Sequence, residues 1–151
     1  MVDKVICGFD SRGEKQIDVI VSALKKLKLK PVVIDCAGLD YVDATLKCIT
    51  AFEKDNSADA ICLVCGTGVG VSIVANRFSF IRAVNAESVS KAYFARRHED
   101  ANCLCLAAGY SDGNETVNTP QIQEIIDTFF KTEFEGGRHK ERVDKLQKMG
   151  E

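Results

Sequence analysis

Residues 60–70 read Ala-Ile-Cys-Leu-Val-Cys-Gly-Thr-Gly-Val-Gly, and this stretch is the strongest indication of the fold. The first six residues form an unbroken apolar run, which is typical of a parallel strand buried on both faces. The alternating glycines that follow predict a tight turn into a helix, with backbone amides pointing outward beside the positive end of the helix dipole. The turn has neither the glycine pattern of a dinucleotide fingerprint nor the lysine of a P-loop. It therefore indicates either another kind of anion-binding loop or a turn that is tight for structural reasons alone.

Strands and helices alternate along the rest of the chain. Apolar runs predict strands at residues 5–9, 31–35, 60–65, 81–86 and 103–108. Helical patterns predict helices at about 17–28, 44–54, from about 71, at 88–97, 120–131 and about 138–148. Such alternation requires crossover connections, so we expect one domain over residues 1–151 with a doubly wound, Rossmann-like α/β fold, in which a five-stranded parallel sheet lies between two layers of helices. Ligands of such folds bind beyond the carboxyl ends of the strands.

The composition excludes several classes of protein. Of the 151 residues, 46% are hydrophobic and 28% are charged, as in an ordinary globular domain. The 20 basic and 22 acidic residues are dispersed, and the short basic run at 138–148 is interpreted as a solvated helix face, so no nucleic-acid partner is expected. No apolar segment is long enough to span a bilayer and no signal pattern opens the chain. We therefore expect a cytoplasmic protein without a membrane partner.

The cysteines do not form the pattern of a disulfide scaffold or a metal site. They number seven, an odd count, and most lie in apolar runs, so we expect reduced thiols. Cys62 and Cys65 are three residues apart in a strand, point to opposite faces and cannot share one metal, so no metal is expected. Cys65 differs because it directly precedes the glycine turn, where amides and the helix dipole favour a thiolate. It is a candidate base or nucleophile.

Other polar side chains allow two interpretations each. His98 follows a predicted helix, where a histidine serves either as a dipole partner or as a catalyst. Asp10 and Asn102 are turn formers or ligand contacts. Arg138 and Arg142 belong to a basic helix start that either faces solvent or binds a phosphate group.

Four segments together resemble a known family, the B-type ribose-5-phosphate isomerases and the related galactose-6-phosphate isomerase subunits. They are residues 65–76, 81–83, 98–102 and 134–139, and the similarity in order and spacing extends over nearly the whole chain. The resemblance implies a cofactor-free aldose–ketose isomerase of the pentose phosphate pathway, with strand order 2-1-3-5-4. It also implies a homodimer or a dimer of dimers, with each active site shared between subunits and the C-terminal helix packed on the partner. The expected reaction interconverts ribose 5-phosphate and ribulose 5-phosphate through a cis-enediolate.

The resemblance also implies a role for each matching residue. Cys65 would be the base that moves a proton between C1 and C2, and His98 would assist opening of the furanose ring. Contacts to the remaining substrate atoms are implied for Thr67, Gly66, Gly68, Val69 and Gly70 at the enediolate, Asp10 and Asn102 at hydroxyl groups, Tyr41 at the pocket wall, and Arg138 and Arg142 at the phosphate. Valine at position 71, where one branch of the family has a glutamate, places the chain with the cysteine branch.

The phosphate end of the substrate is where the chain departs from the family pattern. Ser11 stands where the family has a histidine that helps to hold the phosphate, and Arg12 is the nearby replacement. The loop at 109–113 lacks the usual arginine and carries Asp112 instead. The alternatives are therefore the same mechanism on a hexose 6-phosphate, a tetrose phosphate or an unphosphorylated sugar, or a noncatalytic sugar-phosphate-binding subunit.

Overall fold

The fold is built on a parallel sheet with the strand order β2-β1-β3-β5-β4. The structure is a computed structural model that describes residues 2–109 and 119–150. The strands are β1 (Lys4–Phe9), β2 (Lys30–Val33), β3 (Ala60–Cys65), β4 (Ala83–Asn85) and β5 (Cys103–Ala107). All six residues of β3 are buried at the centre of the sheet. The predicted doubly wound α/β class and the strand order are both confirmed.

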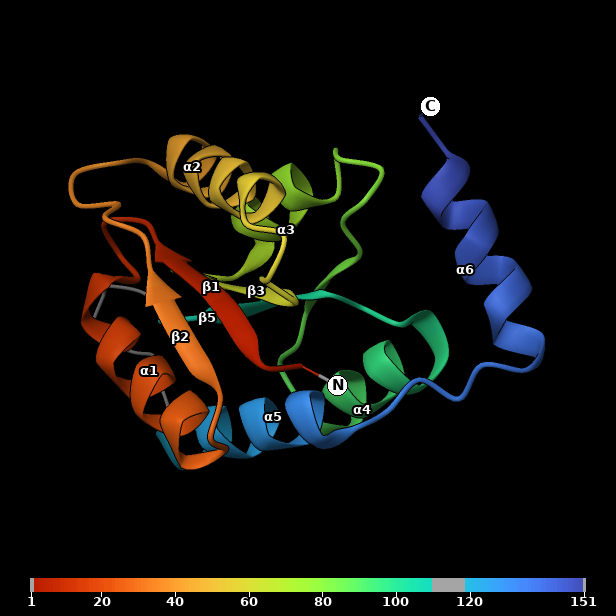
Figure 1. The fold of residues 1–151 in the computed structure, drawn as a ribbon. Coiled ribbons are helices and arrows are strands. Elements are labelled where there is room, and N and C mark those ends of the chain that lie inside the picture. Colours follow the sequence, from red (N-terminus) through yellow and green to blue (C-terminus); the bar gives the residue numbers. More distant parts are fainter. Residues whose placement is uncertain (1, 110–118, 151) are drawn as a thin grey trace.

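Helices cover both faces of this sheet, as Figure 1 shows. They are α1 (Ile17–Lys26), α2 (Tyr41–Lys54), α3 (Val69–Ala75), α4 (Val89–Glu99), α5 (Thr119–Lys131) and α6 (Arg138–Lys148), with a short 3-10 turn, η1 (Glu14–Gln16), before α1. One layer consists of α2 and α3, and the other consists of α1, α5 and α4. The last helix, α6, projects from the body of the molecule beyond the end of α4 (Figure 1). Among the described residues, no helix is long and apolar enough to cross a membrane.

Several elements begin or end at residues other than those predicted. Helix α2 starts at Tyr41 instead of residue 44 because the Asp40 carboxylate accepts a 2.8 Å hydrogen bond from the Asp43 amide and caps the helix. Helix α3 starts at Val69, so part of the glycine turn is already helical. Strand β4 is shorter than the predicted 81–86, since the amide of Arg82 donates to the Asn102 side chain at 2.7 Å instead of to a neighbouring strand.

Candidate active site

The glycine turn and the thiol of Cys65 meet at the carboxyl end of β3. Cys65 is the last residue of the strand and is only 4% exposed. Its Sγ accepts a 3.1 Å hydrogen bond from the amide of Gly68. The hydroxyl of Thr67, part-exposed at the same turn, accepts from the amide of Val69 at 3.1 Å. A thiol and a hydroxyl therefore both lie at the start of α3, each hydrogen-bonded to one of its first amides, an arrangement that suits an oxyanion forming next to a proton-accepting sulfur.

Neighbouring strands fix the shape of this turn. Gly68 has a φ of 74°, and a Cβ there would lie 2.3 Å from Oδ1 of Asn85, the last residue of β4. Asn85 also donates to the carbonyl oxygen of Thr67 at 3.2 Å. After β5, the amides of Ala108 and Gly109 donate to the carbonyls of Cys65 and Gly66. Sequence reasoning missed Asn85, although its place at the end of a strand was the signal that could have identified it.

The other residues predicted at this edge lie around the turn. Asp10 follows β1, and its Oδ1 accepts 2.9 Å hydrogen bonds from the amides of Arg12 and Gly13. The Arg12 side chain passes over the turn, since a Cβ on Gly66 would lie 3.1 Å from its Cδ. The Tyr41 ring lies against Gly70, where a Cβ would approach it to 2.7 Å. Ser11 is exposed beside them.

Position, rather than burial, separates Cys65 from the other thiols. All seven cysteines are free. Burial raises the pKa of Cys62 well above its usual range, which leaves that thiol inert. A hydrogen bond with Cys48, whose Sγ lies 3.9 Å away, is the main cause that lowers the pKa of Cys36 to about 6, but Cys36 is 0% exposed. Cys65 is thus the thiol that combines a strand end with the amide-lined turn.

His98 lies at the opposite end of the strands from Cys65. Helix α4 returns from the carboxyl end of β4 to the amino end of β5, so His98, in its last turn, lies near the amino ends of the strands. Just beyond it, the carbonyl of Asn102 accepts from the amide of Ile61 in β3. Four residue steps of about 3.3 Å, or about 13 Å in all, separate Ile61 from Cys65. A single chain therefore does not bring Cys65 and His98 together.

The side chain of Asn102 is engaged by backbone. Its Oδ1 accepts from the Arg82 amide at 2.7 Å, and its Nδ2 donates to the Phe80 carbonyl at 2.9 Å. In this structure the residue holds the segment before β4 in place.

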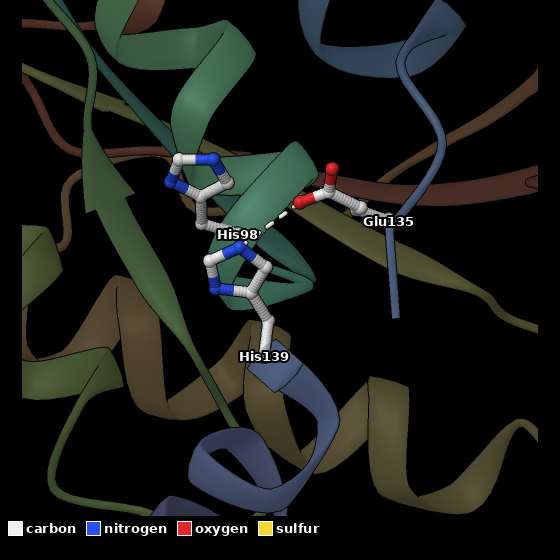
Figure 2. Close-up of side chains that lie close together, drawn as sticks. All are labelled: His98, Glu135 and His139. Atoms are coloured by element: carbon white, nitrogen blue, oxygen red, sulfur yellow. Dashed lines mark ion pairs between the residues drawn. The ribbon is translucent and has the colours of Figure 1, made fainter. Parts of the chain in front are cut away.

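His98 of α4, Glu135 of the segment between α5 and α6, and His139 of α6 form a cluster (Figure 2). The rings of His98 and His139 are stacked, with centroids 4.2 Å apart and planes inclined by 12°. Nε2 of His139 lies 2.9 Å from Oε2 of Glu135, without the alignment of a hydrogen bond. Ligand atoms of the three residues lie within 4.8 Å of one another, as a metal site would require. The nearly parallel rings direct their in-plane lone pairs side by side instead of toward one point, so this arrangement fits stacking better than a shared ion.

Arg138 and Arg142 lie one turn apart at the start of α6, and both are exposed. Neither guanidinium makes an ion pair with any residue that the structure describes. Positive charge at a helix N-terminus is unfavourable with respect to the helix dipole, and a bound anion would relieve this. The loop at 109–113, expected to carry a phosphate contact in the family, lies outside the described residues beyond Gly109.

Comparison with known proteins shows the family of the chain. Residues 5–146 match the family model described as Ribose/Galactose Isomerase. The chain belongs to the ribose/galactose isomerase family. This isomerase is 37% identical over 110 residues to a probable ribose-5-phosphate isomerase B of Mycoplasma genitalium, covering 73% of this chain and 68% of that protein.

Two solved structures resemble the isomerase over almost their whole length. The type B ribose 5-phosphate isomerase of Trypanosoma brucei has a TM-score of 0.85 and 33% identity, covering 97% of this chain and 98% of that one. Ribose-5-phosphate isomerase B of Mycoplasma genitalium, solved with bound ribulose-5-phosphate, has a TM-score of 0.84 and 32% identity, covering 97% and 95%. The chain is thus a sugar-phosphate isomerase with the fold of the B-type enzymes.

Proposed function

We propose that this isomerase interconverts ribose 5-phosphate and ribulose 5-phosphate through a cis-enediolate. The observation that carries the proposal is the thiol of Cys65 at the mouth of the glycine turn, with the Gly68 amide 3.1 Å from its Sγ. Moving a proton between C1 and C2 requires a base beside the substrate and preorganised donors where the oxyanion develops. The thiol of Cys65 would supply the base, and the amides of the glycine turn would supply the donors. The bound ribulose-5-phosphate of the Mycoplasma genitalium structure supports the choice of substrate.

In this mechanism, Cys65 removes the proton from C2 of the open-chain aldose and returns it to C1. Thr67 and the amides of residues 66–70 hold the enediolate oxygens, because amides at the start of a helix point outward beside the positive end of its dipole. Val71, where a glutamate base would otherwise stand, is 1% exposed and packs in the core. His98 moves the proton that opens the furanose ring, and Arg138 and Arg142 bind the phosphate.

We also propose that the protein is a homodimer, or a pair of dimers, whose sites combine Cys65 of one subunit with His98 of the other. The separation of these residues across the sheet supports this arrangement. A groove of about 920 Å³ lies beside His98, and Phe94 of α4 and Leu146 of α6 contribute apolar walls. Helix α3 exposes Val69 (50%) and Ile73 (57%), apolar side chains next to the glycine turn. A second copy of the chain, seated with its α3 in this groove, would cover both surfaces and complete the site.

A hexose 6-phosphate is the second candidate substrate. The family description includes galactose isomerases, and the exposed Ser11 replaces the histidine expected at the phosphate end. A longer sugar would place its phosphate farther from C1, so the two substrates make different demands on that end of the site.

The direct test measures ketose formation from a panel of aldose phosphates and free sugars. Ribose 5-phosphate should give the highest kcat/KM. Cys65→Ala should lower kcat by about 100-fold or more, the usual scale for a general base. Cys62→Ala, in the same strand but buried within the sheet, is the matched control and should reduce stability while keeping kcat. Faster turnover of a hexose 6-phosphate, or near-normal kcat in Cys65→Ala, would overturn the proposal.

A further inference from the structure

His139 is the unusual residue of α6. In a helix whose other residues are mostly exposed, His139 and Val143 are the buried ones, and the imidazole is only 6% exposed. Burying a polar ring is costly unless a partner compensates for the lost water. The buried ring lies flat against His98, with 4.2 Å between the ring centroids (Figure 2).

Glu135 contacts both the His139 ring and Arg97 at the end of α4. Its Oε2 lies 2.9 Å from Nε2 of His139, and its Oε1 lies 3.5 Å from the guanidinium of Arg97. The backbone amide of Glu135 also donates to the Arg97 carbonyl at 3.0 Å. Arg97 contacts Glu135, Glu135 contacts His139, and His139 stacks on His98. These contacts therefore link two consecutive residues at the end of α4 through Glu135 and His139.

His98 itself is held by ring contacts. The centroid of the His98 ring lies 5.0 Å from that of Phe94 and 4.2 Å from that of His139. Neither ring nitrogen of His98 has a hydrogen-bond partner within the described part of the chain, although catalytic and metal-binding histidines are usually oriented by such a bond. Stacking on His139 thus takes the place of the orienting hydrogen bond and leaves both ring nitrogens free for substrate.

We propose that His139 and Glu135 are positioning residues, which hold the plane of the His98 ring for opening of a furanose substrate. The inference rests on the proposed function. In the step concerned, His98 takes the proton of the anomeric hydroxyl, C1 and O1 form a double bond, the bond between C1 and the ring oxygen breaks, and the ring oxygen receives a proton from the imidazolium. No net proton is gained or lost, but both transfers require the ring to face the anomeric centre.

Two substrates separate this role from general support of the site. Ribose 5-phosphate closes into a furanose, whereas an aldotetrose 4-phosphate cannot, because its O4 carries the phosphate. His139→Ala should lower kcat/KM for ribose 5-phosphate by about 10- to 100-fold, the scale for groups that orient a functional histidine, and change the tetrose value by less than about threefold. Glu135→Gln should show the same preference with a smaller loss. His139→Phe, which keeps a stacking ring, should recover most of the activity. The matched control is Val143→Ala, at the other buried position of α6, and any loss should fall equally on both substrates.

A second measurement observes ring opening without isomerisation. In a Cys65→Ala background, exchange between the two anomers of [1-13C]ribose 5-phosphate can be followed by two-dimensional exchange NMR. Addition of His139→Ala should slow the enzyme-catalysed exchange by about tenfold or more. Unchanged exchange, or equal losses on both substrates, would show that His139 has only a structural role. If the unmodified enzyme isomerises no pentose or tetrose phosphate at all, the proposed function fails instead.

Discussion

Gly68→Ala should damage the turn beside Cys65 in two separable ways. The first is conformational: at a φ of 74°, any residue with a Cβ is strained by about 1–2 kcal/mol. The second is steric, since the new Cβ would lie 2.3 Å from Asn85 Oδ1 and 3.1 Å from the carbonyl carbon of Leu106. Displacing Asn85 breaks its hydrogen bond to Thr67, which adds about 0.5–1.5 kcal/mol. The free energy of unfolding should fall by about 1.5–3.5 kcal/mol in total.

Gly38 offers a control with the same strain and no collision. Its φ is 77°, and a Cβ there would meet nothing within 4 Å. Gly38→Ala should therefore lose only the conformational part, about 1–2 kcal/mol, and keep its kcat. Urea unfolding of both variants measures the difference. The double variant Gly68→Ala/Asn85→Ala removes the closest collision and should lose less than the two single losses added together.

Activity gives the second half of the test. Because the Gly68 amide donates to Cys65 Sγ, a displaced turn should lower kcat by about tenfold or more. The reasoning would be refuted if Gly68→Ala were no less stable than Gly38→Ala and retained normal turnover, since the turn would then have no need of a glycine at this position.

Three further predictions follow from the site and the fold. When Cys65→Ala and His98→Asn chains are unfolded together and refolded in equal amounts, activity should return to about a quarter of the wild-type level. The reason is that half the dimers are mixed and each mixed dimer has one intact site. Absence of recovery, with mixed dimers detected by native mass spectrometry, would rule out the shared site. Arg138→Ala should raise KM for ribose 5-phosphate by about 10- to 100-fold, as for loss of a charge-assisted hydrogen bond, and leave an unphosphorylated substrate unaffected; an equal rise for both would make Arg138 structural. A hydrogen bond from Lys4 at 2.6 Å, together with hydrogen bonds from Ser57, lowers the pKa of the Asp55 carboxyl from 3.8 to about 2. The ionised carboxylate therefore stabilises the fold above about pH 4, and this stabilisation is lost as the pH falls through 2. Asp55→Asn should therefore be less stable than the wild type in urea at pH 7, and the difference should disappear near pH 2; a difference independent of pH would contradict this.

Local sequence pattern predicted the fold class and the placement of Cys65 beside the glycine turn. The run at 60–65 must be buried on both faces, and its alternation with helical segments leaves few topologies besides a doubly wound sheet. The glycine turn and Cys65 are adjacent in the chain, so their proximity needs no tertiary contact to be predicted. Element boundaries could not be read as closely, since the Asp40 cap lets α2 begin at Tyr41, three residues before the predicted start.

Contacts between residues far apart in the chain could be assigned only from the packed fold. Asn85 packs under Gly68 because β4 and β5 bring it there, and Glu135 reaches His139 and Arg97 because the segment between α5 and α6 passes the end of α4. Periodicity and local propensity act over a few residues, whereas these contacts join segments up to about forty residues apart through the order in which strands and helices pack. The same packing places Cys65 at the carboxyl ends and His98 near the amino ends of the strands, a separation that no local pattern predicts.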